Sequence, residues 1–303
     1  MSPIPTHNPR IPEGINASEE HPLKEFLQLL IGISLALIIA VVLLGFLIKL
    51  AAPYIPFKWE LALAPSLNDF IEGESVGELT QTRQTALIEL GQKLLAATES
   101  KEIAAKDFTF HFVAADSSNA YATLGGHIVI TDDLMHDVSS ENGLAMVMAH
   151  EIAHIQLRHP IESTSRRVLI QLLLSIVTGS TGSQLPGGVL SSTSALTLLG
   201  FSRDMESAAD QRALDILRQH YGHLGGADEF FRTMESEEAS ARWLEFTQTH
   251  PNVGRRLEVI QQAMKAESPA IPLIPLSQTL RGIEQTTAAL VPIPARADDI
   301  GKR

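Results

Sequence analysis

The stretch that decides the fold is His150-Glu151-Ile152-Ala153-His154, which reads HEIAH. Two histidines four positions apart on a helix lie one turn above each other on the same face. Both imidazole rings can then reach a single Zn²⁺ ion. The glutamate beside the first histidine is placed to take a proton from a water molecule at that metal. The pentapeptide therefore predicts one zinc ion at His150 and His154, with Glu151 as the general base of peptide hydrolysis.

The helix that carries this motif is predicted to be buried. It should begin near Ser139 and Ser140, which are good helix caps, and end before Pro160. Apolar residues occupy nearly all sides of it, so two histidines on it need partners inside the protein, and a metal would supply them. The alternative is that the HExxH pattern occurs here by chance, which has a probability of roughly a few per cent in a chain of this length and histidine content.

A third metal ligand is expected on a later helix. In the pattern HExxHxxGxxH a third histidine completes the site, but here Leu157 and Pro160 occupy the glycine and histidine positions. The other solution is a glutamate. Glu206 follows a capping serine, Ser202, and shares its helix face with small and apolar residues. Asp210 lies one turn further along, where it can accept a hydrogen bond from the outer nitrogen of a ligand histidine. A solvated acidic face is the alternative.

A predicted strand precedes the metal helix. Residues 127–131 (HIVIT) follow the pair Gly125-Gly126, which indicates a tight turn. We expect this strand to form the upper edge of the substrate cleft, where a peptide can add as a further strand through main-chain hydrogen bonds. Asn119, Gly126 and Ile128 are assigned to this edge. A plain hairpin edge without a substrate is the alternative.

A long apolar segment lies near the N-terminus. Residues 26–50 (FLQLLIGISLALIIAVVLLGFLIKL) carry no charge before Lys49, and about 20 apolar residues suffice to cross a bilayer as a helix. A buried core helix and a cleaved signal peptide are the alternatives. Core helices rarely run so long without charge, and the apolar region of a signal peptide is shorter. We therefore expect a single-pass membrane anchor. The positive charges before and after it are nearly balanced, so they hardly determine which end lies on which side of the membrane.

The segments around these features set the expected domain boundaries. The N-terminal residues lack an apolar period, and the C-terminal ones are rich in proline with scattered charge. Aromatic side chains after the apolar segment, Tyr54 and Trp59, suit a membrane interface. The expected parts are a mobile leader (1–25), a transmembrane helix (26–50), a linker (51–65), a metallopeptidase domain (66–267) and an extended tail (268–303).

Two further features narrow the function. Residues 166–200 predict either two core helices around a loop, or a hairpin that touches the bilayer or covers the cleft. The net charge of −12 argues against a nucleic-acid partner, and the absence of cysteine excludes disulfides, thiolate metal sites and cysteine nucleophiles.

Taken together, the motifs resemble the HtpX-like zinc metallopeptidases of peptidase family M48, which includes the CAAX prenyl proteases and the mitochondrial Oma-type protease. The resemblance covers about residues 65–265. With one span rather than several, the chain is closest to the single-anchor branch. The motifs that carry the resemblance are HEIAHIQLRH, Glu206-Ser-Ala-Ala-Asp210, Thr249-His250-Pro251 with Arg256, and Asn119-Ala120-Tyr121 with Gly125-Gly126.

The resemblance implies an α+β fold that is mostly α, namely a zincin-like (gluzincin) domain with a small edge sheet behind one transmembrane helix. It implies that His150, His154 and Glu206 bind the zinc. It also implies that His250 faces the metal, where it either stabilises the oxyanion of the tetrahedral intermediate or caps the zinc in a resting state. Arg256 would pair with nearby acidic groups such as Asp210.

The expected function is that of a membrane-anchored zinc metalloendopeptidase that cuts damaged or misassembled proteins. Its partners would be protein or peptide substrates and, through residues 26–50, the lipid bilayer. A zinc-bearing, chaperone-like adaptor or scaffold with a blocked active site is the alternative. A third class, a membrane protein without metal, would leave two buried histidines unexplained. In a Gram-negative host, a domain behind an N-terminal anchor of the inner membrane most simply faces the periplasm.

Overall fold

The computed structural model describes residues 22–64, 78–98, 103–115, 117–178, 200–236, 243–267 and 272–281. The chain divides into two compact units, Met1–Leu47 and Ile48–Arg303. Residues 1–21 of the predicted leader, residues 179–199 of the 166–200 segment and residues 282–303 of the tail lie outside the described residues, so the hypotheses about them remain expectations.

Helix α1 (Pro22–Ala51) supplies the described residues of the first unit. At 1.5 Å per residue it is about 45 Å long, which exceeds a hydrocarbon core of about 30 Å. Its most apolar window has a mean hydropathy of 3.0, and none of its residues is buried. Within the described ranges it is the one helix with the length and composition of a membrane span. It begins four residues before the predicted segment and ends one residue after it.

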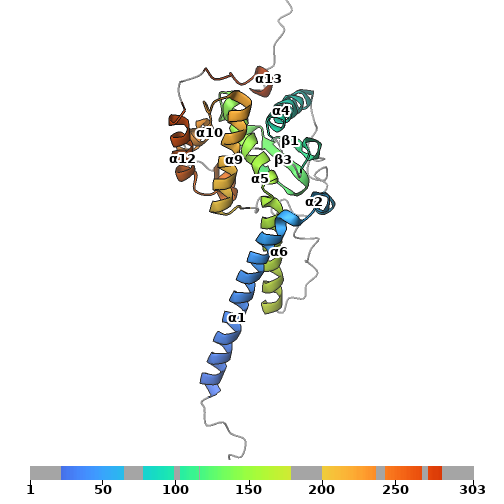
Figure 1. Ribbon diagram of the computed structural model, residues 1–303, viewed down its shortest axis with the longest axis vertical. Helices are drawn as coiled ribbons and strands as arrows, with labels where there is room; N and C mark the ends of the chain where they lie inside the picture. Colours follow the sequence, from blue (N-terminus) through green and yellow to red (C-terminus); the bar gives the residue numbers. More distant parts are fainter. Residues whose placement is uncertain are drawn as a thin grey trace, which may run out of the picture. The chain divides into compact units, whose positions relative to one another are not determined.

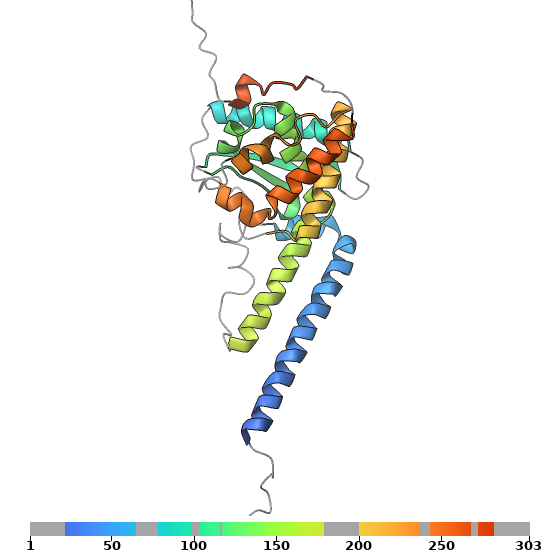
Figure 2. The ribbon, with the colours of Figure 1, turned by 90° about the vertical axis from the view of Figure 1, so that its left-hand side faces the viewer.

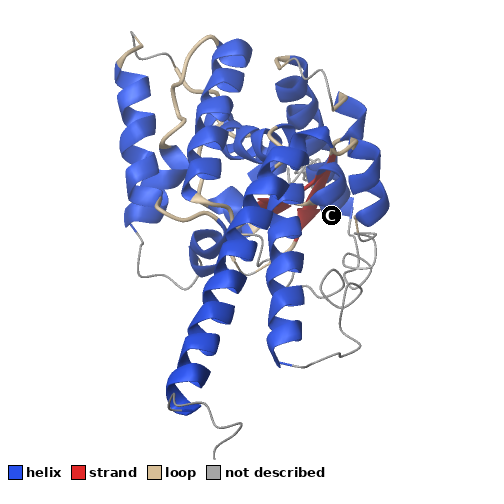
Figure 3. Ribbon diagram, turned by 60° about the horizontal axis from the view of Figure 1, so that its bottom comes forward, coloured by secondary structure: helices blue, strands red, loops and turns tan. Residues whose placement is uncertain are grey.

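The second unit is built of helices around a small sheet (Figures 1 and 3). This arrangement confirms the predicted fold class, which was mostly α with a small sheet. The helices are α2 (Phe57–Leu63), α4 (Glu78–Ala96), α5 (Glu141–Gln156), α6 (His159–Thr178), α9 (Arg203–Tyr221), α10 (Glu229–Ser236), α11 (Leu244–Thr249), α12 (Val253–Lys265) and α13 (Gln278–Arg281), with short 3₁₀ turns at η1 (Ala52–Tyr54), η2 (Ala105–Asp107), η3 (Leu124–Gly126) and η4 (Asp133–His136).

The sheet has three strands, β1 (Thr109–Val113), β2 (Ala120–Ala122) and β3 (His127–Thr131), in the order β1-β3-β2. Strand β3 pairs in parallel with β1 and antiparallel with β2. The prediction that β3 is the edge strand is therefore wrong. Ile128 pairs with Phe110 on one side and Ala122 on the other, so it cannot receive a substrate strand. Strand β2 is the edge on the side of α5.

Helix α5 runs through the centre of this unit, and Figure 1 shows it between α9 and the sheet. Every residue from 142 to 155 is buried. The helix begins as predicted, because the Ser140 hydroxyl accepts a hydrogen bond from the Gly143 amide at 3.0 Å. The Glu229 carboxylate from α10 accepts hydrogen bonds from the hydroxyls of Ser139 and Ser140. A side chain at Gly143 would lie 2.5 Å from that carboxylate, so this contact requires glycine.

Part of the predicted tail packs beside the start of α5. The amide of Glu141 donates to the carbonyl of Ile274, and the amide of Leu276 donates to that of Ser139. Leu276 and Leu280 are buried in the main core. The packed unit therefore extends past residue 267, where the sequence predicted it to end. Helices α9 and α12 close the far side of α5 and lie next to each other in Figure 2.

The predicted linker also has a defined structure. We call residues 52–64 the strap, because they hold η1 and α2 and pack across the second unit. Glu60 is 2% exposed and forms an ion pair at 2.8 Å with Arg158, which follows α5. Arg158 also donates to the carbonyl of Ile55. Arg158 adopts φ 64°, a left-handed conformation that ends the helix and turns the chain.

Glu60 should give the stability of this unit a pH dependence. Burial raises its pKa from 4.5 to about 7, although Arg158 favours the ionised form. Between these values the folded protein keeps a proton that the unfolded chain has released. The free energy of unfolding should therefore fall as pH rises from 4.5 to about 7, by at most about 3 kcal/mol. Urea unfolding in detergent at several pH values, followed by fluorescence of the buried Trp243, measures this slope.

Glu60→Gln is the control for this pH dependence, because glutamine keeps the size of the side chain and cannot titrate. The variant should flatten the slope between pH 5 and 7. A wild-type stability that rises with pH relative to Glu60→Gln over this range would contradict the assignment.

Candidate metal centre

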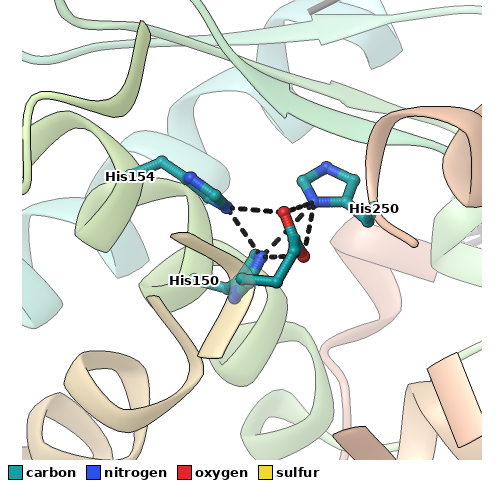
Figure 4. A group of neighbouring side chains, drawn as sticks. His150, His154 and His250 are labelled. Carbon is teal, nitrogen blue, oxygen red and sulfur yellow. Dashed lines mark hydrogen bonds and ion pairs between the residues drawn. The ribbon is translucent and has the colours of Figure 1, made fainter. Parts of the chain in front are cut away.

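Four buried side chains converge in the second unit, as Figure 4 shows for its three labelled histidines. His150 and His154 come from α5, Glu206 from the first turn of α9, and His250 from the residue that ends α11. One ligand atom from each of the four lies within 4.8 Å of the others. Each residue is at most 2% exposed. The three predicted metal ligands are therefore adjacent, and His250 joins them.

The distances within the cluster show that its nitrogen and oxygen atoms face one another. The Nε2 atoms of His150 and His154 are 2.9 Å apart. Oε2 of Glu206 lies 3.4 Å from Nε2 of His150, and Oε1 of Glu206 lies 3.4 Å from Nε2 of His154. Imidazole lone pairs and a carboxylate that converge in this way are a poor arrangement unless a cation or a proton lies among them. Two imidazoles and one carboxylate are also a common donor set for Zn²⁺. The residues therefore fit a divalent metal ion.

The protonation states of His154 and Glu206 agree with this donor set. Burial and Arg256 lower the pKa of His150, but its hydrogen bonds to Asp210 and Glu206 outweigh them and raise it to about 9, so a metal ion would displace a proton from this ring. Burial and the neighbouring His150 hold the pKa of His154 well below its ordinary value, which keeps its imidazole neutral, as a metal ligand must be. Burial alone would raise the pKa of Glu206, but His250 and Arg256 outweigh it and hold that pKa well below 4.5. The carboxylate is therefore ionised.

Asp210 and Arg256 support the cluster from behind. An Asp210 carboxylate oxygen lies 3.0 Å from Nδ1 of His150, on the side of the ring away from Glu206. Arg256, from α12, donates to Asp210 at 2.7 and 2.8 Å and pairs with Glu206 at 2.6 Å. Its guanidinium stacks over the Phe231 ring at 4.8 Å. The proton on His150 Nδ1 is thus held toward Asp210, and Nε2 faces the cluster, with a guanidinium nitrogen of Arg256 3.1 Å from it.

One further residue of this site, His159, was not indicated by the sequence motifs. Its Nδ1 lies 2.9 Å from Nδ1 of His154, the nitrogen that faces away from Glu206. Burial, with a smaller effect of His150, lowers the pKa of His159 to about 4, so the ring is neutral. Phe201 stacks on the His154 ring at 3.8 Å. Five positions along a continuous helix would place His159 on another face, and the left-handed turn at Arg158 is what returns it to His154.

Glu151 lies next to the cluster with no fixed partner. It is fully buried, and neither carboxylate oxygen has a hydrogen-bond partner among the described residues. Nε2 of His250 lies 3.6 Å from one oxygen of Glu151. Burial raises the pKa of Glu151. A buried carboxylate without partners is costly, and its retention beside a metal cluster is typical of a group that accepts a proton during catalysis.

The residues predicted to form the substrate edge have different positions. The amide of Asn119 donates to the Thr131 hydroxyl at 2.9 Å, so Asn119 anchors the start of β2. Gly126 has φ 82°, and a side chain there would lie 2.0 Å from the carbonyl oxygen of Asp107, so it shapes the turn before β3. The main chain nearest the cluster is that of Ala120, whose carbonyl oxygen is 3.3 Å from His250 Nε2.

Comparison with known proteins agrees with the site. The Mitochondrial metalloendopeptidase OMA1 of Schizosaccharomyces pombe is 29% identical over 155 residues, which cover 50% of this chain and 45% of that protein. The Beta-barrel assembly-enhancing protease of Escherichia coli is 27% identical over 179 residues, or 55% of this chain and 36% of that protein. The Metalloendopeptidase OMA1, mitochondrial, of Bos taurus is 26% identical over 201 residues, or 59% and 36%.

The chain thus spans less than half of the length of each of these three relatives. The sequence profile described as Peptidase family M48 matches residues 81–264, which is more than half of the chain and includes all four residues of the cluster. The resemblance inferred from the motifs is confirmed. The chain belongs to peptidase family M48, a family of metallopeptidases.

Proposed function

We propose that the protein is a membrane-anchored zinc endopeptidase that hydrolyses peptide bonds in damaged or misassembled proteins. The observation that carries this proposal is the buried cluster of His150, His154 and Glu206 beside the unpartnered carboxylate of Glu151. The substrate class is supported by the name of one relative, a beta-barrel assembly-enhancing protease. Helix α1 is the proposed anchor.

In this proposal, His150 Nε2, His154 Nε2 and a Glu206 oxygen hold one Zn²⁺ ion. When bound, the ion would polarise the scissile carbonyl and lower the pKa of the attacking water. Glu151 takes the proton of that water and later gives it to the leaving amine. The raised pKa of Glu151 suits both steps. A carboxylate with a pKa closer to neutrality accepts a proton more readily than an ordinary glutamate does, and its acid form still releases the proton more readily than the acid form of a strong base.

The position of His250 supports a resting state. Its Nδ1 lies 3.2 Å from both oxygens of Glu206 and 3.4 Å from Nε2 of His150, so it takes the fourth corner of the cluster. Phe246 stacks on the ring at 4.6 Å. We propose that His250 caps the metal in this arrangement, and that it stabilises the oxyanion once the loop after α11 has moved. This capped geometry also supports the second candidate, an adaptor whose site stays blocked.

The substrate is proposed to pair with β2 rather than β3. Strand β2 has one partner, β3, within the described sheet, so its other edge can add a peptide strand. The carbonyl of Ala120 faces His250 at 3.3 Å in this arrangement. A movement of His250 would therefore free a metal corner and a strand acceptor together. We keep the inner membrane of a Gram-negative bacterium, with the domain in the periplasm, as the proposed location, and protease digestion of intact spheroplasts tests it.

Removal of the metal tests the proposed activity. Purified full-length protein in detergent should cleave casein, lose this activity with 1,10-phenanthroline, and regain it on addition of Zn²⁺. Metal analysis of the same sample should find about one zinc per chain. Bound zinc without cleavage under any activating condition would favour the adaptor. Absence of bound metal in protein purified without chelator would overturn both candidates.

A further inference from the structure

The strap holds the second unit through its inner face. Ala52, Ile55 and Ala64 pack against Leu124 and Ile161 in a small apolar cluster. The Arg158 guanidinium lies 5.3 Å from the centre of the Phe57 ring and pairs with Glu60. Glu60 also accepts a hydrogen bond from the Gly125 amide. The strap thus contacts the end of α5, the start of α6 and the turn between β2 and β3.

The outer face of the strap has an unusual composition for a surface in water. Tyr54 is 85% exposed, Trp59 59% and Leu61 47%, while the acidic Glu60 between them is 2% exposed. A helix on a water-facing surface normally buries its apolar residues and exposes its charged ones. Outside α1, the described residues expose seven large apolar or aromatic side chains, and three of them belong to the strap. The outer face therefore carries three large apolar or aromatic side chains, which we call the apolar patch, while the acidic residue of α2 is buried.

The chain keeps this face close to the end of α1. Five residues lie between Ala51 and Phe57, so an extended chain of six steps spans at most about 20 Å between them. Whatever the orientation of the two units, α2 therefore lies near the place where α1 leaves the bilayer. Tyrosine and tryptophan rings prefer the headgroup region of a membrane, where their polar atoms reach water. The exposed Lys58 can reach lipid phosphates at the same depth.

We propose that the outer face of the strap lies in the headgroup region of the bilayer, with Tyr54, Trp59 and Leu61 as its lipid contacts. The inner face then fixes the distance of the metal helix from the membrane through Glu60 and Arg158. The occupant of the apolar patch is thus a phospholipid surface rather than a second polypeptide. This placement does not depend on the proposed peptidase activity, and an inactive protein would show it equally.

Trp59 is a natural probe for this proposal, since the only other tryptophan, Trp243, is 2% exposed in the core. Full-length protein is reconstituted in vesicles of phosphatidylcholine and phosphatidylglycerol, and its emission is compared with that of Trp59→Phe. The difference spectrum, which belongs to Trp59, should be blue-shifted and protected from aqueous iodide. Lipids brominated near the headgroup should quench most of it, and lipids brominated near the chain ends should quench less. The Trp243 emission should respond to neither quencher.

The absence of cysteine permits a second measurement with a matched control. Leu61→Cys and Val259→Cys replace side chains of similar exposure, 47% and 50%, in the strap and in α12. A spin label at position 61 should collide more with oxygen than with a water-soluble nickel chelate, and a label at position 259 should show the reverse. Quenching of Trp59 by iodide and not by lipid would overturn the proposal. So would protection of Trp59 from both quenchers, which would assign the face to a polypeptide.

Discussion

Glu151→Gln is expected to abolish peptide hydrolysis while the metal stays bound. Glutamine has almost the same shape as glutamate but cannot accept the proton of the attacking water, a role worth roughly 10²–10⁴ in rate. Both Glu151 oxygens lack hydrogen-bond partners within the described structure, so the substitution breaks no contact there. It also removes a carboxyl group whose burial opposes ionisation, so thermal stability should stay equal or rise. Metal analysis, thermal unfolding and casein cleavage on one preparation measure all three effects.

The matched control for this variant is Glu141→Gln. Glu141 lies on the same helix, in its first turn, and its side chain meets the hydroxyl of Tyr221 at 3.1 Å, away from the cluster. It should keep its activity within a few-fold. Loss of metal in Glu151→Gln would mean that the residue is structural, and full activity in that variant would mean that another group activates the water.

The metal helix could be predicted from sequence because its signals are local. Ser140 caps its start, its buried faces repeat at helical spacing, and His150 and His154 are one turn apart. Ser202 likewise caps α9, with its hydroxyl accepting from the Met205 amide, and so places Glu206 in the first turn. In these cases the sequence interval alone determines where a side chain points.

The features that sequence did not reveal depend on contacts between distant residues. Strand β3 reads as an edge strand because local alternation carries no information about β1, which pairs with it from the other side. The strap reads as a linker because the contact that holds it joins Glu60 to a residue 98 positions further along the chain, Arg158. His159 contacts His154 because the chain makes a left-handed turn at Arg158. Glycine or asparagine would have indicated such a turn in the sequence, but this position is an arginine.

The strap also changes how the site relates to its anchor. A flexible linker would let the metal helix take many orientations relative to the membrane. The contact between Glu60 and Arg158 fixes the strap to the second unit, so the strap is not such a linker within that unit. The orientation relative to the membrane follows only from the proposed lipid contacts of the strap. Arg158 is four residues after His154, so the segment that follows α1 is joined almost directly to the metal cluster.

Glu206→Ala is expected to remove metal binding altogether, and it is the sharpest test of the ligand set. The variant leaves His150 and His154 as a two-nitrogen site, which lacks the third protein ligand of catalytic zinc sites. It also leaves Arg256 with Asp210 as its remaining acidic partner, so the protein should unfold at lower temperature. Equilibrium dialysis with Zn²⁺ measures the affinity, and Asp204→Ala, an exposed acidic residue in the same first turn, should bind as the wild type does.

Substitution of Asp210 or His159, which contact the outer nitrogens of the histidines, should weaken zinc binding only in part. This partial loss distinguishes residues that orient the ligands from the ligands themselves. Asp210→Asn and His159→Ala each remove the partner of an outer histidine nitrogen without touching the inner ones. Such partners orient the rings, so each variant should lower zinc affinity by roughly 10–100-fold rather than abolish binding. Because His150 and His154 contact each other and share Glu206, the two effects should be coupled rather than additive in free energy. Stoichiometric zinc in Glu206→Ala together with its loss in Asp210→Asn would show that the carboxylate ligand is Asp210, and that the side chains face the metal differently than proposed.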